Sequence, residues 1–68
     1  MVSPIKLKRV QKEISQTDLF LKTGIPAWRI SLIERGIIPQ EAEAEKLAHA
    51  LNAPVNELFP ALAQAVRG

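Results

Sequence analysis

The residues with the clearest potential for chemistry lie between Gly24 and Gly36, in the stretch GIPAWRISLIERG. This stretch sets a Trp and an Arg beside apolar residues that repeat at helical spacing. An arginine guanidinium can donate two parallel hydrogen bonds to a carboxylate, a phosphate or the edge of a guanine. An exposed Trp can bury a large apolar area against a partner. These side chains favour recognition over bond-making chemistry.

The remaining residue types do not assemble a catalytic site. The chain has no cysteine, no nucleophile beside a base and no phosphate-binding glycine loop. His49 has no second ligand within helical reach, and Glu41 and Glu45 have an electrostatic reason to stand at the start of a helix. We therefore expect no enzyme activity, no cofactor, no metal and no small-molecule ligand.

The charge is unevenly distributed along the chain. Residues 1–36 hold seven Lys or Arg against three acidic residues, a balance of +4, whereas residues 37–68 hold two against four, a balance of −2. The basic half favours a polyanionic partner such as nucleic acid. The sequence lacks the apolar run of a membrane span or a signal peptide, so we expect a cytoplasmic protein without a membrane partner.

Aliphatic residues and Ala supply most of the apolar content, which is typical of an all-α fold. Ser3 and Pro4 have the order of an N-cap followed by the first helical residue. Ser15 and Asp18 form an acidic variant of the capping box. We predict a compact five-helix bundle, with helices at residues 4–12, 16–23, 26–35, 39–51 and 55–59.

Only Gly24 and Ile25 stand between the second helix and Pro26, which leads into the third. A connection this short fixes a sharp angle, as in a helix-turn-helix. In the third helix the apolar spacing turns Ile30 and Ile33 inward. The outward surface then consists of Trp28, Ser31, Leu32 and Arg35, flanked by Ala27 and Arg29. A helix buried on one side only suits the major groove of DNA.

One domain is predicted over residues 1–60, followed by a C-terminal tail at residues 61–68. Leu62 and Val66 share a face if the tail continues as a helix. That face is either a dimer seam or part of a frayed end, and fraying is the more common behaviour of terminal segments.

Four motifs together resemble the helix-turn-helix domains of the phage repressor and Cro type, which occur in many bacterial transcriptional regulators. They are SQTDL at 15–19, Gly24 with Ile25, RISLIERG at 29–36 and LAHALNAPVNELF at 47–59. The resemblance, which spans Ile5 to Phe59, implies a five-helix domain that binds double-stranded DNA, generally as a homodimer. It implies that the third helix enters the major groove.

The resemblance also implies roles for individual residues. Gln16 contacts the DNA backbone beside the capping residue Ser15, and Arg9 pairs with Glu34 to tie the first helix to the third. The full set expected at the DNA interface is Ser15, Gln16, Lys22, Ala27, Trp28, Arg29, Ser31, Leu32 and Arg35. Lys22, Arg35 and the lysines of the first helix are the candidates for phosphate contacts.

Departures from the family pattern are all toward apolar residues. Family members usually carry polar residues at the positions of Trp28 and Leu32, so Arg29 is the candidate for a bidentate pair with guanine. The position of Phe20 is commonly a small Ala, which implies a shifted helix crossing or a ring turned aside. Ile37 and Ile38 stand where the family often has Lys or Arg.

These apolar residues raise a second hypothesis. Trp28, Leu32, Ile37 and Ile38 could form the docking surface of a protein-interaction module built on the same scaffold. A third arrangement would leave no such surface: Trp28 folds back onto neighbouring turns, and the two isoleucines pack against the fourth helix.

Overall fold

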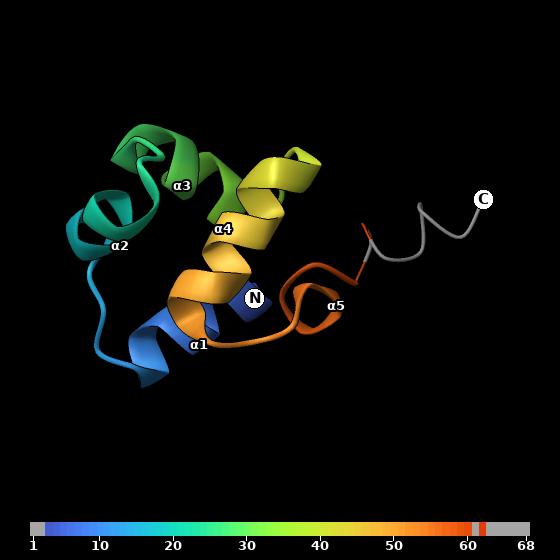
Figure 1. The fold of residues 1–68 in the computed structure, drawn as a ribbon, viewed down its shortest axis with the longest axis horizontal. Helices are drawn as coiled ribbons and strands as arrows, with labels where there is room; N and C mark the ends of the chain where they lie inside the picture. The colour runs from blue at the N-terminus through green and yellow to red at the C-terminus, as the bar shows by residue number, and fades with distance from the viewer. Residues whose placement is uncertain (1–2, 61, 63–68) are drawn as a thin grey trace.

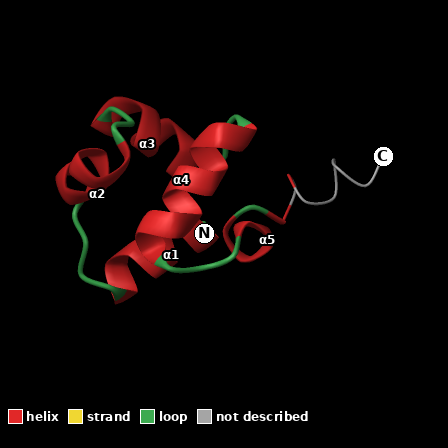
Figure 2. Ribbon diagram, viewed as in Figure 1, coloured by secondary structure: helices red, strands yellow, loops and turns green. Residues whose placement is uncertain are grey.

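A computed structural model describes residues 3–60 and residue 62 of the 68-residue chain. In this part of the chain five helices follow one another (Figure 1): α1 (Pro4–Gln11), α2 (Gln16–Thr23), α3 (Ala27–Glu34), α4 (Glu41–Leu51) and α5 (Val55–Leu58). The segments between them are loops and turns, and the described residues contain no strand (Figure 2). The predicted all-α fold is confirmed.

The first two helices begin where the sequence predicted, because a serine caps each of them. Ser3 Oγ accepts a hydrogen bond from the Lys6 N–H over 3.3 Å. At α2, Ser15 Oγ accepts from the Asp18 N–H over 3.0 Å, and the Asp18 carboxylate accepts from the Ser15 N–H over 3.2 Å. This reciprocal pair satisfies two backbone donors at the helix start.

The start of α4 differs from the prediction, which placed Pro39 at the beginning of this helix. The helix begins at Glu41, because Gln40 is extended and occupies the N-cap position. The Gln40 N–H donates to the Glu43 carboxylate over 2.9 Å, which holds Gln40 outside the helix. The end was predicted correctly: Asn52 adopts the left-handed conformation, with φ of 54°, and stops the helix.

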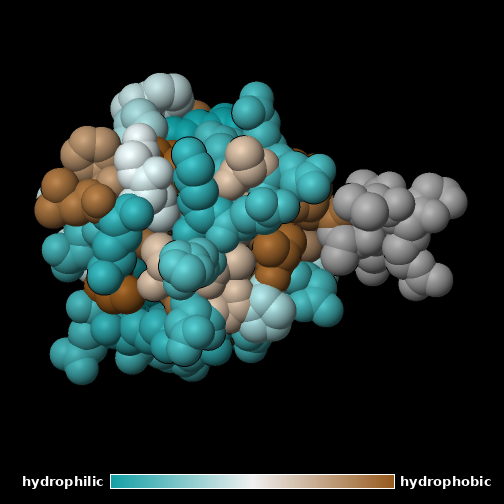
Figure 3. Space-filling model, in the orientation of Figure 1, coloured by the Kyte–Doolittle hydropathy of each residue, from teal (hydrophilic) through white to brown (hydrophobic). Residues whose placement is uncertain are grey.

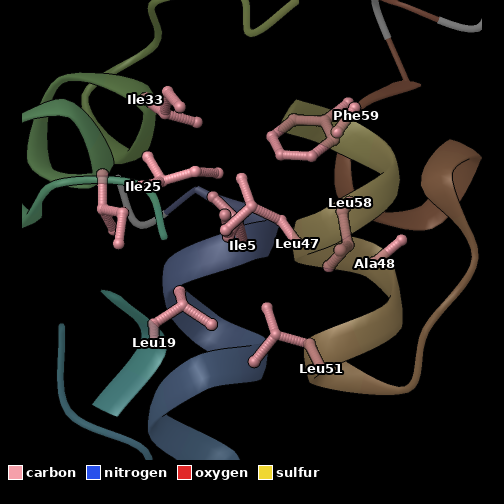
Figure 4. Packing of buried hydrophobic residues seen from close by; sticks show 11 residues of the cluster. Ile5, Leu19, Ile25, Ile33, Leu47, Ala48, Leu51, Leu58 and Phe59 are labelled. Carbon is pink, nitrogen blue, oxygen red and sulfur yellow. The ribbon is translucent and has the colours of Figure 1, made fainter. Parts of the chain in front are cut away.

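The core forms around α4, which crosses the middle of the molecule (Figure 1). Side chains from all five helices and the turn after α2 converge there (Figure 4). The residues of this core cluster are Ile5, Leu19, Ile25, Ile30, Ile33, Ala44, Leu47, Ala48, Leu51, Leu58 and Phe59. The predicted inward direction of Ile30 and Ile33 is thus confirmed.

The chain after α5 still contacts this core at Leu62, whose side chain is partly buried and whose N–H donates to the Phe59 carbonyl over 3.1 Å. Most of the predicted tail, including Val66 of the candidate dimer seam, lies outside the described residues. The boundary at residue 60 therefore stays a prediction.

The turn between α2 and α3 is fixed by local hydrogen bonds. Gly24 has φ of 78°, a left-handed conformation that favours glycine, and its N–H donates to the Phe20 carbonyl over 2.7 Å. Thr23 Oγ1 donates to the Leu19 carbonyl and accepts from the Ile25 N–H. Since Ile25 is itself buried, the turn holds α3 at a defined angle to α2.

Candidate nucleic-acid interface

Helix α3 presents one face to the core and the other to solvent. Ile30 and Ile33 are buried, whereas Trp28 keeps 67% of its surface exposed. Arg35 is exposed as well, and Ala27, Ser31 and Leu32 are partly exposed. The arrangement in which Trp28 folds back onto neighbouring turns is therefore wrong, and the predicted outward surface is available to a partner.

The C-terminal end of α3 is held by a buried glutamate. Glu34 accepts from Arg9 Nε over 2.6 Å and from Arg9 Nη2 over 3.4 Å, and its side chain is only 4% exposed. Arg9 Nη1 also donates to the Ile14 carbonyl over 2.9 Å. These bonds join α1, the loop after it and α3, as expected for a structural pair.

The same glutamate also positions Gln16 at the start of α2. Gln16 Nε2 donates to Glu34 Oε1 over 3.1 Å, and the residue is partly exposed. The amide nitrogen carries a second N–H, which this bond leaves free. The side chain expected at the DNA backbone is thus oriented by the buried ion pair.

Arg29, an arginine of the predicted interface, is also paired. Arg29 Nε donates to Glu43 Oε2 over 3.0 Å, and Arg29 Nη2 donates to Glu43 Oε1 over 2.9 Å. The hydrogen bond from Arg29 lowers the pKa of Glu43 below its ordinary value, and the Gln40 N–H adds to this effect. The same bond raises the pKa of Arg29. The carboxylate is therefore ionised at neutral pH.

Glu43 is a residue that the sequence did not assign to the site, because acidic residues are expected in the first turn of any helix. The pair joins residues fourteen apart across the loop between α3 and α4, so helical spacing gives no sign of it. Only the tertiary fold, in which α3 and α4 both pack against α2, brings the two side chains together.

Apolar residues also reach the surface outside α3. Phe20 is 40% exposed, which agrees with the second of the two expectations for this residue, a ring turned aside from the helix crossing. Leu21 beside it is exposed as well. Figure 3 shows apolar atoms over α2 at the left edge of the molecule. Ile37 and Ile38 are exposed too, which contradicts the alternative arrangement in which they pack against α4. Lys22 adds a positive charge near the end of α2.

Ile37 and Ile38 border a cavity of about 140 Å³ on the side of the molecule formed by the start of α1 and by α5. Pro4, Leu58 and Phe59 line the same cavity, whereas Trp28 and Leu32 do not. The four residues of the protein-docking hypothesis thus do not line one common hollow.

Other kinds of site find no support in the described residues. Within residues 3–60 and 62, no cluster of three His, Cys, Asp or Glu side chains could hold a metal ion. No helix in the same part of the chain has the length and apolar character to cross a bilayer.

Two helices joined by a tight glycine turn, the second of them exposed on its outer side, define a helix-turn-helix domain. Comparison with protein families agrees, since the family described as helix-turn-helix matches residues 5–58. The chain belongs to this family, which is of the phage repressor and Cro type. It is therefore a DNA-binding domain of the kind found in transcriptional regulators. Searches of curated proteins and of solved structures found no match.

Proposed function

We propose that this protein binds double-stranded DNA sequence-specifically, with α3 in the major groove. The observation that carries the proposal is the one-sided burial of α3 behind the fixed turn at Gly24. An α-helix with its side chains is about 10–12 Å in diameter, and the major groove is about 12 Å wide and admits one helix. The helix can therefore enter the groove while Ile30 and Ile33 stay in the core.

Phosphate contacts come from the residues around α3. The free N–H of the Gln16 amide and the start of α2 suit a phosphate oxygen, with Ser15 capping beside them. Lys22 and Arg35 are exposed and supply positive charge. Affinity should therefore fall as salt rises, with a log–log slope of about −0.9 for each phosphate neutralised.

Base contacts come from the outward surface of α3. Ala27, Trp28 and Leu32 offer apolar contact, which suits thymine methyl groups, and the Ser31 hydroxyl can donate or accept. Arg29 is the side chain of this set that can form a bidentate pair with guanine. We therefore expect the protein to prefer DNA sites in which a guanine lies beside thymines.

Two copies of the domain on a two-fold symmetric site complete the proposal. Half-sites would then lie about one helical turn of DNA apart, or a multiple of it. Light scattering with and without a duplex of two half-sites tests this step, and a single copy on the preferred duplex would contradict it.

The test is an amide-shift NMR titration with mixed-sequence duplex DNA at low and high salt. Shifts should concentrate on Gln16, on α3 and on the Trp28 indole, and should vanish at high salt. The amides of α5 lie away from the proposed face and serve as the internal control. Unmoved signals at low salt would contradict DNA binding through this face.

A second candidate function, a protein-interaction module, is favoured by the exposure of Trp28, Ile37 and Ile38. Large exposed apolar side chains on a small domain commonly mark a partner surface. In that case dilution alone would shift the fluorescence of Trp28, and replacement of Ile38 by Ser would abolish the shift. Duplex DNA would leave the fluorescence unchanged.

A further inference from the structure

Two arginine–glutamate pairs hold α3, and they differ in what they leave free. Both glutamates bind their arginine through Nε and Nη2. In the pair of Arg9 and Glu34, the remaining nitrogen Nη1 donates to the Ile14 carbonyl. Because all three nitrogens of Arg9 have partners within the protein and its side chain is 12% exposed, this pair is closed to any ligand.

The pair of Arg29 and Glu43 is open. Within the described residues, no side chain or backbone carbonyl accepts a hydrogen bond from Arg29 Nη1. No buried side-chain nitrogen or oxygen in that part of the chain lacks a partner, so Nη1 must be in contact with solvent. The side chains of Arg29 and Glu43 are 25% and 20% exposed, which places the pair at the surface rather than in the core.

A guanidinium has two edges that can each donate two parallel hydrogen bonds. The side edge, Nε with Nη2, is occupied by Glu43. The end edge, Nη1 with the second N–H of Nη2, remains available, and its two donors match the O6 and N7 acceptors of guanine. Glu43 is itself held by the Gln40 N–H, so the orientation of the guanidinium plane depends on the start of α4.

We propose that Glu43 is a positioning residue that aims the end edge of Arg29 at guanine, and so sets the base preference of α3 without contacting DNA. This inference rests on the proposed function. An arginine without such a partner samples many rotamers and loses side-chain entropy on binding, whereas the paired arginine is already oriented. The hydrogen bond from Arg29 lowers the pKa of Glu43, so the orienting carboxylate keeps its charge to more acid pH than an unpaired glutamate does.

The experiment compares the wild type with Glu43→Gln and Arg29→Lys. The preferred duplex is first selected from a random-sequence pool, and binding is then measured to it, to the same duplex with 7-deazaguanine in place of each guanine, and to a non-specific duplex. Glu45→Gln is the matched control, because it removes the same charge from an exposed position two residues further along α4. Thermal unfolding of each variant checks that it is folded.

The ratio of the affinities for the preferred duplex and for its 7-deazaguanine version measures the guanine preference. We expect this ratio to fall about tenfold in Glu43→Gln and in Arg29→Lys, which is the scale of one bidentate contact. For Glu43→Gln, binding to the non-specific duplex should change only as much as it does for Glu45→Gln. A residue that merely joined α3 to α4 would lower both affinities together, and that result would overturn the proposal.

Three other results are informative. If Arg29→Lys loses the guanine preference and Glu43→Gln keeps it, Arg29 reads the base unaided and the proposal fails while the proposed function stands. If both variants keep the preference, Arg29 is not the reader, and the proposal fails in the same way. If the wild type prefers no duplex over another, sequence-specific binding itself fails.

Discussion

Replacing Glu34 by Gln should destabilise the domain far more than removing any exposed carboxylate. The side chain is 4% exposed and accepts from Arg9 Nε, Arg9 Nη2 and Gln16 Nε2. Gln preserves the shape but removes the charge, which leaves the guanidinium of Arg9 unpaired at 12% exposure. Breaking a buried pair on one side costs about 3–5 kcal/mol.

That cost is large for a chain of this size. At about 0.05–0.15 kcal/mol per residue, a domain of 68 residues has a free energy of unfolding of roughly 3–10 kcal/mol. Urea unfolding followed by far-ultraviolet circular dichroism measures the loss. The matched control is Glu57→Gln, which breaks the pair of Lys8 and Glu57, where side-chain exposures are 26% and 50%. An exposed pair of this kind contributes at most about 1 kcal/mol.

A double variant separates the charge from the packing. Arg9→Met with Glu34→Met removes both charges and fills the site with apolar atoms, so it should regain most of the free energy that Glu34→Gln loses. The reasoning is refuted if Glu34→Gln costs no more than Glu57→Gln, or if the double variant is as unstable as the single one.

Three further predictions concern caps, the turn and pH. Ser15→Ala removes one half of the reciprocal cap and should cost about 1 kcal/mol in thermal unfolding, with Thr17→Ala as the neighbouring control. Gly24→Ala should cost about 1–2 kcal/mol through its φ of 78° alone, because nothing lies within 4 Å of the added Cβ; an unchanged melting temperature would contradict the strain. The pKa of Glu43 is below its ordinary value of 4.5, so its pair with Arg29 stabilises the fold above that pH and is lost as pH falls through the lowered pKa. The difference in unfolding free energy between the wild type and Arg29→Met should therefore shrink in acid, and a difference that is constant with pH would argue against the pair.

Most helix boundaries could be predicted because their causes are local. Ser3, Ser15 with Asp18, Gly24 and Asn52 each act on backbone groups within a few residues. The inward faces follow from apolar spacing in the same way. The end of α1 was harder to predict from the sequence, because the residue that takes the left-handed conformation there is Glu13, with φ of 56°, and not a glycine.

The side-chain pairs of the site depend on contacts that spacing does not encode. Arg9 and Glu34 lie twenty-five residues apart, and only the family resemblance suggested their pairing. Nothing suggested the pair of Arg29 and Glu43, because it needs both the packing of α3 and α4 against α2 and the exact start of α4 at Glu41. Pro39 was a misleading signal for that start, since the bond from Gln40 to Glu43 makes Gln40 the N-cap and the helix begins two residues later than predicted, at Glu41.

The orientation of α3 requires these polar pairs as well as the core. Ile30 and Ile33 are almost fully buried, so the core fixes which face of α3 is turned inward, but apolar contact is not directional and tolerates a small roll of the helix about its axis. Ion pairs made through two nitrogens are directional, and α3 carries one toward α1 through Glu34 and one toward α4 through Arg29. Because successive residues on a helix differ by about 100° in direction, a roll large enough to turn Trp28 and Leu32 aside would also bring Ile30 or Ile33 to the surface. The apolar core therefore sets which residues of α3 face outward, and the two arginine–glutamate pairs hold that orientation more narrowly.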